Sequence, residues 1–127
     1  MSKSILSAGE IIRHMLLESQ AVAAITNKVF PVAVDNADLP YIVYRRMDMR
    51  QVPTANGRGA DTGTYQVLCC ADGYTASVDL AEAVREAIDG KQGEYEGLRL
   101  RMCNLTNSDE AWDADAFVQR LIFTIKI

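Results

Sequence analysis

The chain has 127 residues, the length of one domain that can bury an ordinary core. Apolar residues make up 49% of the chain and charged residues 24%, which excludes wholesale disorder. The 13 basic and 17 acidic residues give a net charge of −4, so a dedicated nucleic-acid binder is disfavoured because such proteins carry a basic footprint.

The N-terminal segment predicts an amphipathic helix. Ser7 and Glu10 fit a capping box, and apolar residues then recur on one face over about residues 8–19. Residues 20–26 follow as a second short turn. Because the segment is amphipathic and not continuously apolar, we expect neither a signal peptide nor a membrane span, and a protein that resides in the cytoplasm.

Two strands and a long loop are predicted next. Residues 28–34 contain Pro31 and indicate an edge strand or an extended connector, and residues 41–47 are rich in β-branched and aromatic side chains. Residues 50–63 have no apolar periodicity and contain several glycines. They predict a long hairpin loop, and loops of that length are usually functional or mobile.

The second half predicts a strand, a helix and two further strands. Residues 64–71 alternate as in a strand, Thr75 fits the cap of a second helix, and Gly90 fits its end. Strands follow at residues 98–103 and 117–127. This order predicts one α+β domain over residues 1–127, with a mainly antiparallel sheet of four to five strands and two helices packed on one face.

The sequence shows no catalytic or metal-binding pattern. His14 is the only histidine and lies on the polar side of the first helix, where we interpret it as solvated. Cys69, Cys70 and Cys103 lack C-x-x-C spacing and are interpreted as reduced, structural thiols. Gly57-Arg58-Gly59 is too short for a phosphate loop. We therefore predict no enzyme, no metal and no cofactor.

An acidic run surrounds the single tryptophan, and we interpret it as a solvated loop between the last two strands. The run comprises Asp109, Glu110, Asp113 and Asp115, without the glycine pattern of an EF-hand. Trp112 has two open interpretations: it covers an edge of the core, or it anchors a partner, as interface aromatics often do.

Arginines supply the remaining candidate surface. Arg45, Arg46 and Arg50 would form a basic stripe with Arg99 and Arg101 if their strands were neighbours. Such a stripe could contact phosphate or the carboxylates of another subunit, or it could be a solvated sheet face. The candidate interface residues are Arg45, Arg50, Arg58, Arg99, Arg101, Trp112 and Asp113.

The order of elements and several short apolar motifs resemble a known family. The first helix is followed by residues 22–31, which end in Val29-Phe30-Pro31, and a polar turn then leads into Leu39-Pro40-Tyr41-Ile42-Val43-Tyr44. A glycine-rich loop, a strand, a helix over residues 79–88 and two closing strands complete the match. In these features the chain resembles the tail-completion (tail-terminator) family of tailed bacteriophages and prophages.

The resemblance implies a non-enzymatic virion protein. Members form a ring, here expected to have six subunits, at the head-proximal end of the tail, where they stop tube polymerisation and join the tail to the head connector. The implied partners are further copies of the chain, the tail-tube protein and the head–tail connector protein, with no membrane and no specific nucleic-acid ligand. A small cytoplasmic ligand-binding or regulatory α+β domain, with a pocket between helices and sheet, stays open as the alternative.

Overall fold

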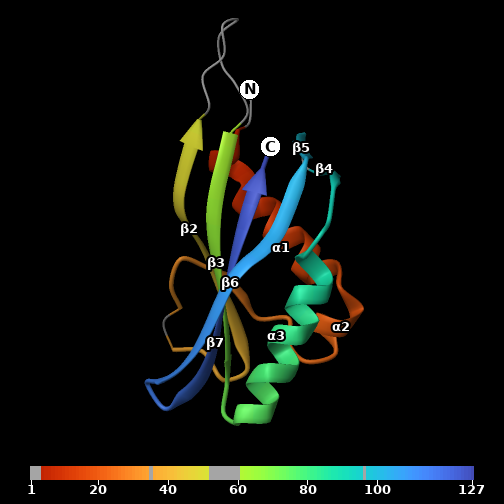
Figure 1. Cartoon of the computed structure of the whole chain (residues 1–127). Coiled ribbons are helices and arrows are strands. Elements are labelled where there is room, and N and C mark those ends of the chain that lie inside the picture. Colours follow the sequence, from red (N-terminus) through yellow and green to blue (C-terminus); the bar gives the residue numbers. More distant parts are fainter. Residues whose placement is uncertain (1–3, 35, 52–60, 96) are drawn as a thin grey trace, which may run out of the picture.

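The structure, a computed structural model, describes residues 4–34, 36–51, 61–95 and 97–127. It is an α+β fold, as predicted (Figure 1). Its helices are a 3-10 turn at Ile5–Ser7, α1 at Ala8–Glu18, α2 at Gln20–Ala23 and α3 at Tyr74–Ile88. Its strands are β1 Val29–Pro31, β2 Tyr41–Gln51, β3 Asp61–Ala71, β4 Gly93–Tyr95, β5 Leu98–Leu100, β6 Met102–Asp113 and β7 Ala116–Lys126.

Five of the strands form one sheet in the order β1-β2-β3-β7-β6, and β4 and β5 pair separately. The pairs β2–β3, β3–β7 and β7–β6 are antiparallel. Strand β1 pairs in parallel with β2, so the sheet is mixed. The prediction of a mainly antiparallel sheet is thus correct except at this edge, where β1 runs in the same direction as the first part of β2.

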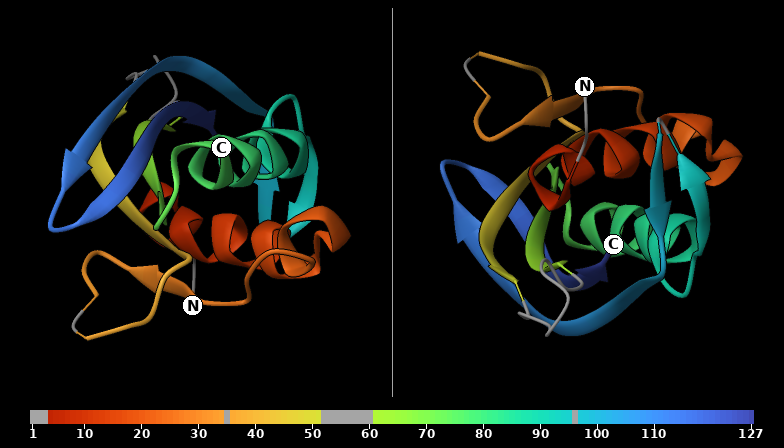
Figure 2. Two further views of the ribbon diagram at one scale, coloured as in Figure 1. Left: turned by 90° about the horizontal axis from the view of Figure 1, so that it is seen from below. Right: turned by 90° about the horizontal axis from the view of Figure 1, so that it is seen from above.

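The helices lie on one side of the sheet, which curls around α1 and α3 (Figure 2). The short α2, which packs against both, raises the number of α-helices in the described residues to three where two were predicted. Apolar side chains of α1 and α3 meet those of β3 and β7 in a single buried cluster that includes Leu16, Val84, Val67 and Phe123. Burial of these side chains is the main stabilising contribution to the fold.

The start of α1 differs from the predicted capping box. The Ser7 side chain makes no capping hydrogen bond, and Ser4 acts one turn earlier, where its Oγ accepts from the Leu6 N–H at 3.2 Å. The resulting 3-10 turn buries Ile5 against the sheet, and the Tyr65 hydroxyl donates to the Ile5 carbonyl at 3.0 Å. Ser7 therefore keeps the predicted N-cap position of α1, but the side-chain hydrogen bond is made by Ser4, which caps the 3-10 turn.

Helix α3 also begins earlier than predicted and ends as predicted. Gly73 occupies the N-cap position that was assigned to Thr75. At the other end Gly90 has a φ of +76°, which favours glycine just beyond a helix. Its N–H donates to the Cys103 carbonyl at 2.6 Å, and Asp89 Oδ1 accepts from the Leu105 N–H at 2.8 Å. These bonds attach the end of α3 to the first part of β6.

Parts of two predicted loops are strand. Strand β2 continues to Gln51 and β3 begins at Asp61, so both ends of the predicted loop over residues 50–63 belong to the sheet. Its remainder, with Arg58, lies outside the described residues. The acidic run is also a strand, because β6 pairs with β7 as far as Asp113 and turns at Ala114 and Asp115, whose φ angles are positive.

Candidate functional site

The candidate arginines lie in two separate places. Arg45 and Arg50 are on β2 in the main sheet. Arg99 is on β5 in the two-stranded sheet, and Arg101 follows that strand. Strands β2 and β5 do not pair, so these arginines do not form the single stripe that the sequence suggested.

The exposed part of β2 begins where β1 ends. The last contact between them is a hydrogen bond from the Val32 N–H to the Tyr44 carbonyl at 2.7 Å. Residues 45–51 are all exposed, and within the described residues no strand pairs with their outer side. Arg45 Nε donates to Gln66 Oε1 at 3.0 Å, and Arg46 donates to the Leu6 carbonyl at 3.3 Å. Neither contact neutralises the positive charge of the guanidinium.

An aromatic cluster occupies the hairpin of β6 and β7. Trp112 is 58% exposed and packs edge-on against Phe117, its cross-strand neighbour, with ring centroids 4.7 Å apart. Tyr74 at the start of α3 meets the same Phe117 at 6.0 Å. Trp112 thus lies on Phe117 and outside the buried core cluster.

Polar contacts hold the same cluster in place. Glu110 accepts a hydrogen bond from the Tyr74 hydroxyl and another from Gln119 Nε2, both at 2.9 Å. The bond to Glu110 raises the pKa of Tyr74 above its ordinary value. These partners did not emerge from the sequence, because Glu110 and Tyr74 are 36 residues apart and meet only through the packing of α3 beside the hairpin.

The opposite face of the hairpin carries an ion pair. Arg120 reaches Asp109, its cross-strand neighbour, through Nε at 2.6 Å and through Nη2 at 3.0 Å. The carboxylate raises the pKa of the guanidinium. Asp113 is exposed and makes no ion pair with any residue in the described part of the chain. The end of β6 therefore presents negative charge to the solvent.

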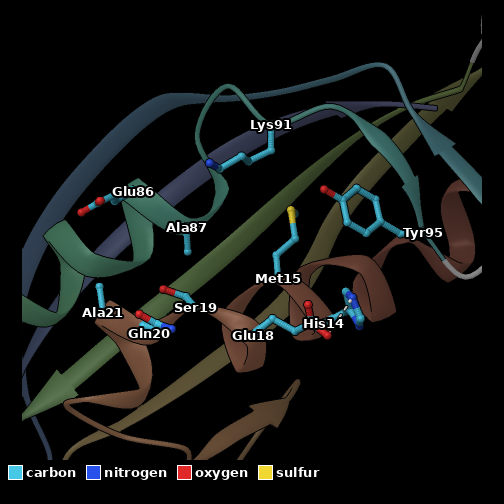
Figure 3. A pocket seen from close by; sticks show the side chains of 10 residues that line it. All are labelled: His14, Met15, Glu18, Ser19, Gln20, Ala21, Glu86, Ala87, Lys91 and Tyr95. Atoms are coloured by element: carbon cyan, nitrogen blue, oxygen red, sulfur yellow. Dashed lines mark ion pairs between the residues drawn. The ribbon is translucent and has the colours of Figure 1, made fainter.

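A cleft of about 490 Å³ lies between α1, α2, α3 and Tyr95 (Figure 3). Met15 forms part of its lining, and His14 pairs with Glu18 at 3.5 Å. The hydroxyl of Ser19, also in the lining, accepts from the Val22 N–H and so caps α2. Hence neither His14 nor Ser19 forms a nucleophile and base pair here.

The cysteines are buried, and burial raises the pKa of all three thiols, to about 11 for Cys70 and about 12 for Cys103. The thiolate, which is the nucleophile and metal ligand, is thus disfavoured at neutral pH. Among the described residues no group of three or more His, Cys, Asp or Glu side chains is placed to hold a metal ion. No helix in the described ranges is long and apolar enough to cross a membrane.

Comparison with known proteins identifies the family. A family model described as "Tail completion protein gp17" matches residues 10–127. The chain belongs to this family. It is therefore a structural protein of the phage tail and not an enzyme. The resemblance drawn from the sequence is confirmed.

A solved structure shows the same fold. A chain from the "Virion of native gene transfer agent (GTA) particle" superposes with a TM-score of 0.77 at 17% sequence identity, over 91% of this chain and 90% of that one. At this identity the match shows the fold alone. Comparison with curated proteins gives no match.

Proposed function

We propose that this tail-completion protein is a ring-forming subunit that caps the tail tube and helps to join tail to head. Membership of the tail-completion family over residues 10–127 is the observation that carries the proposal. A closed ring requires heterologous contacts, in which different surfaces of one subunit meet its neighbours. Strands β2 and β6 flank the central strands β3 and β7, and we call them the outer strands, although β1 covers the first part of β2. They supply such different surfaces, since the exposed part of β2 bears arginines and that of β6 bears carboxylates.

The partners follow from that role. They are further copies of the chain, in a ring of six subunits, the tail-tube protein and the head–tail connector protein. The chain would be made in the bacterial cytoplasm and end in the virion tail. A specific nucleic-acid ligand is not part of the proposal, because the net charge is −4 and the arginines are divided between two sheets.

The cleft beside α1 is one place that the ligand-binding alternative could use. Polar and charged side chains form most of its lining, and the charged ones include both acidic and basic groups: Glu18, Glu86 and Lys91. Small-molecule sites are mostly apolar with a few converging polar groups. The cleft therefore gives no specific support to this alternative, and we do not adopt it.

The test is polymerisation of tail-tube protein from the same phage with and without the purified chain. We expect shorter tubes and, by electron microscopy, ring-shaped density at one tube end. Sedimentation at high concentration and low salt, with and without tubes, should show the chain moving onto tube ends. Unchanged tube lengths together with a stable twofold dimer that ignores tubes would overturn the proposal.

A further inference from the structure

The sheet has two free edge segments of similar length. We call residues 45–51 of β2 the basic edge and residues 106–113 of β6 the acidic edge. Every residue of both segments is exposed, and within the described chain neither has a strand on its outer side. Exposed strand edges present rows of backbone N–H and C=O groups that can pair with another strand.

The rest of each outer strand is already covered. Strand β1 pairs with β2 at residues 42–44, and the end of α3 bonds the Cys103 carbonyl and the Leu105 N–H of β6. The Asn107 side chain accepts from the Ser108 N–H at 2.8 Å, which covers one more donor near the start of the acidic edge. Only the far part of each outer strand is therefore available for pairing.

The charges of the two edges are complementary. The basic edge contains three arginines, at 45, 46 and 50, and one carboxylate, Asp48. The acidic edge contains Asp109, Glu110 and Asp113 and no lysine or arginine. Pairing of two acidic edges, or of two basic edges, would place like charges opposite each other, which is destabilising. Unlike edges attract, so the chain favours a head-to-tail contact over a twofold dimer.

We propose that the basic edge of one copy pairs antiparallel with the acidic edge of the next, so that the sheet continues from subunit to subunit. The direction follows from the sheet itself, because three successive antiparallel pairs make β6 run opposite to β2. This contact rests on the proposed ring and gives it a specific interface. Backbone pairing would supply affinity, and the charges would select the partner edge.

In one register opposite charges meet, and the side chains that lie opposite each other point to the same face of the continued sheet. It places Arg50 opposite Asp109 and Arg45 opposite Asp113. The bulge between Arg46 and Asp48 absorbs the extra residue of β2. In the same register Asp48 lies opposite Ala111 and so meets no carboxylate.

The register also joins exposed apolar side chains. Met47 is 46% exposed on the basic edge and falls opposite Trp112, which is 58% exposed on the acidic edge. Contact between a thioether and an aromatic ring is favourable, and tryptophan is common at the centre of interfaces. Trp112 would thus be the apolar anchor of the contact, with Asp109 and Asp113 on either side.

The pairing offsets neighbouring copies along the strands. Within one copy Arg50 is level with Met102, through Thr62 and Lys126. In the proposed contact it lies beside Asp109, about seven residues further along β6, which is roughly 23 Å at the usual rise per residue. The strands of such a ring would therefore tilt relative to the ring axis, as in closed sheets generally.

The experiment uses charge reversal at one predicted pair. Arg45→Asp and Asp113→Arg, each alone, should weaken self-association on tube ends on the order of tenfold or more, because like charges then meet at every contact. An equimolar mixture of the two variants should assemble again, since each contact then joins opposite charges. The double variant Arg45→Asp/Asp113→Arg should also assemble. Arg13→Asp on α1 and Asp79→Arg on α3, both at exposed positions, are matched controls and should assemble normally.

The outcomes separate the contact from the ring itself. Melting temperature checks that each variant is folded. Within residues 106–113, the N–H groups that do not bond β7 should be protected from hydrogen exchange in the ring and unprotected in the monomer. If the wild-type chain forms rings and both single variants also do, or if the mixture of the two variants does not, the edge contact is overturned and the proposed ring remains. A wild-type chain that never forms rings, with or without tubes, overturns the proposed function and the edge contact together.

Discussion

The central strands β3 and β7 and the outer strands β2 and β6 have nearly the same length but opposite surroundings. Each has 11 residues, except β6 with 12. No residue of β3 is exposed and only Lys126 of β7 is, whereas β2 ends in seven exposed residues and β6 in eight. Both central strands pair on two sides and pack under α3.

The difference in exposure implies different roles for the central and the outer strands. Removal of a side chain from a central strand leaves a cavity or an unsatisfied polar group, so it lowers the free energy of unfolding. Removal of one from the exposed half of an outer strand changes little inside the subunit. We therefore expect folding to depend on β3 and β7, and assembly on the outer halves of β2 and β6.

The largest expected effect is that of Phe123→Ala in β7. Phe123 is fully buried in the core cluster, so its truncation should lower the free energy of unfolding by about 3–5 kcal/mol. Urea denaturation followed by circular dichroism measures it. A loss below about 1 kcal/mol would break the comparison, because the centre of the sheet would then be no more sensitive than its edges.

Per pH unit, alkaline pH should have the next largest effect, and again through the centre of the sheet. Burial raises the folded pKa of Cys69 and Cys103 above the unfolded value of about 8.5. The stability these thiols contribute is fully present below that pH and is lost as the pH rises towards the folded pKa. Each thiol should lower the free energy of unfolding by about 1.4 kcal/mol per pH unit within this window.

Denaturation curves from pH 7 to 11 test this dependence. The variants Cys69→Ala and Cys103→Ala should each show a shallower fall of stability above pH 9, whatever their stability at neutral pH. An identical slope in both variants and the wild type would show that the thiols are not responsible.

Tyr65→Phe should have a smaller effect, and it tests the contribution of a single hydroxyl group in the central strand β3. The hydroxyl donates to the Ile5 carbonyl within the buried end of β3, so its removal leaves that acceptor without its partner. We expect a loss of about 1–2 kcal/mol. Tyr95→Phe is the matched control, since that hydroxyl makes no hydrogen bond in the described part of the chain, and it should change stability less.

Trp112→Ala should have the smallest effect on folding. The ring is mostly exposed and loses only its contact with Phe117, so the free energy of unfolding should fall by no more than about 1 kcal/mol. The same variant should bind tube ends more weakly in the sedimentation assay. A change of several kcal/mol would place Trp112 among the folding residues and remove the contrast with Phe123.

Much of the fold could be predicted because its signals are local. The period of apolar residues in α1 and α3, the alternation along β3 and β7, and Gly90 beyond α3 each follow from a few neighbouring residues. The errors occurred where a distant residue decides. Ser7 holds the N-cap position of α1 without a capping hydrogen bond, because a 3-10 turn that Ser4 caps and Tyr65 contacts precedes it. Most of the acidic run is a strand because β7 pairs with it.

The candidate surface shows the same division more sharply. The sequence selected Arg45, Trp112 and Asp113 by residue type and grouped the arginines by an assumed neighbourhood of strands. Which residues belong together depends on the strand order, which puts Arg99 in another sheet and leaves Glu110 beside Tyr74. Strand order arises from pairing between segments far apart in the chain, and local patterns contain no record of it.

The sequence by itself determined the α+β class, the positions of the main helices and central strands, the absence of a catalytic motif, and the family. These properties depend on residue type and on periods of two and 3.6 residues, which are written along the chain. Only the tertiary structure decided that β1 is parallel, that β2 and β6 lie at opposite sides of one sheet, and that their exposed halves differ in charge. The physical reason is that an edge is free only when nothing else in the folded chain covers it, and that is a property of the whole sheet.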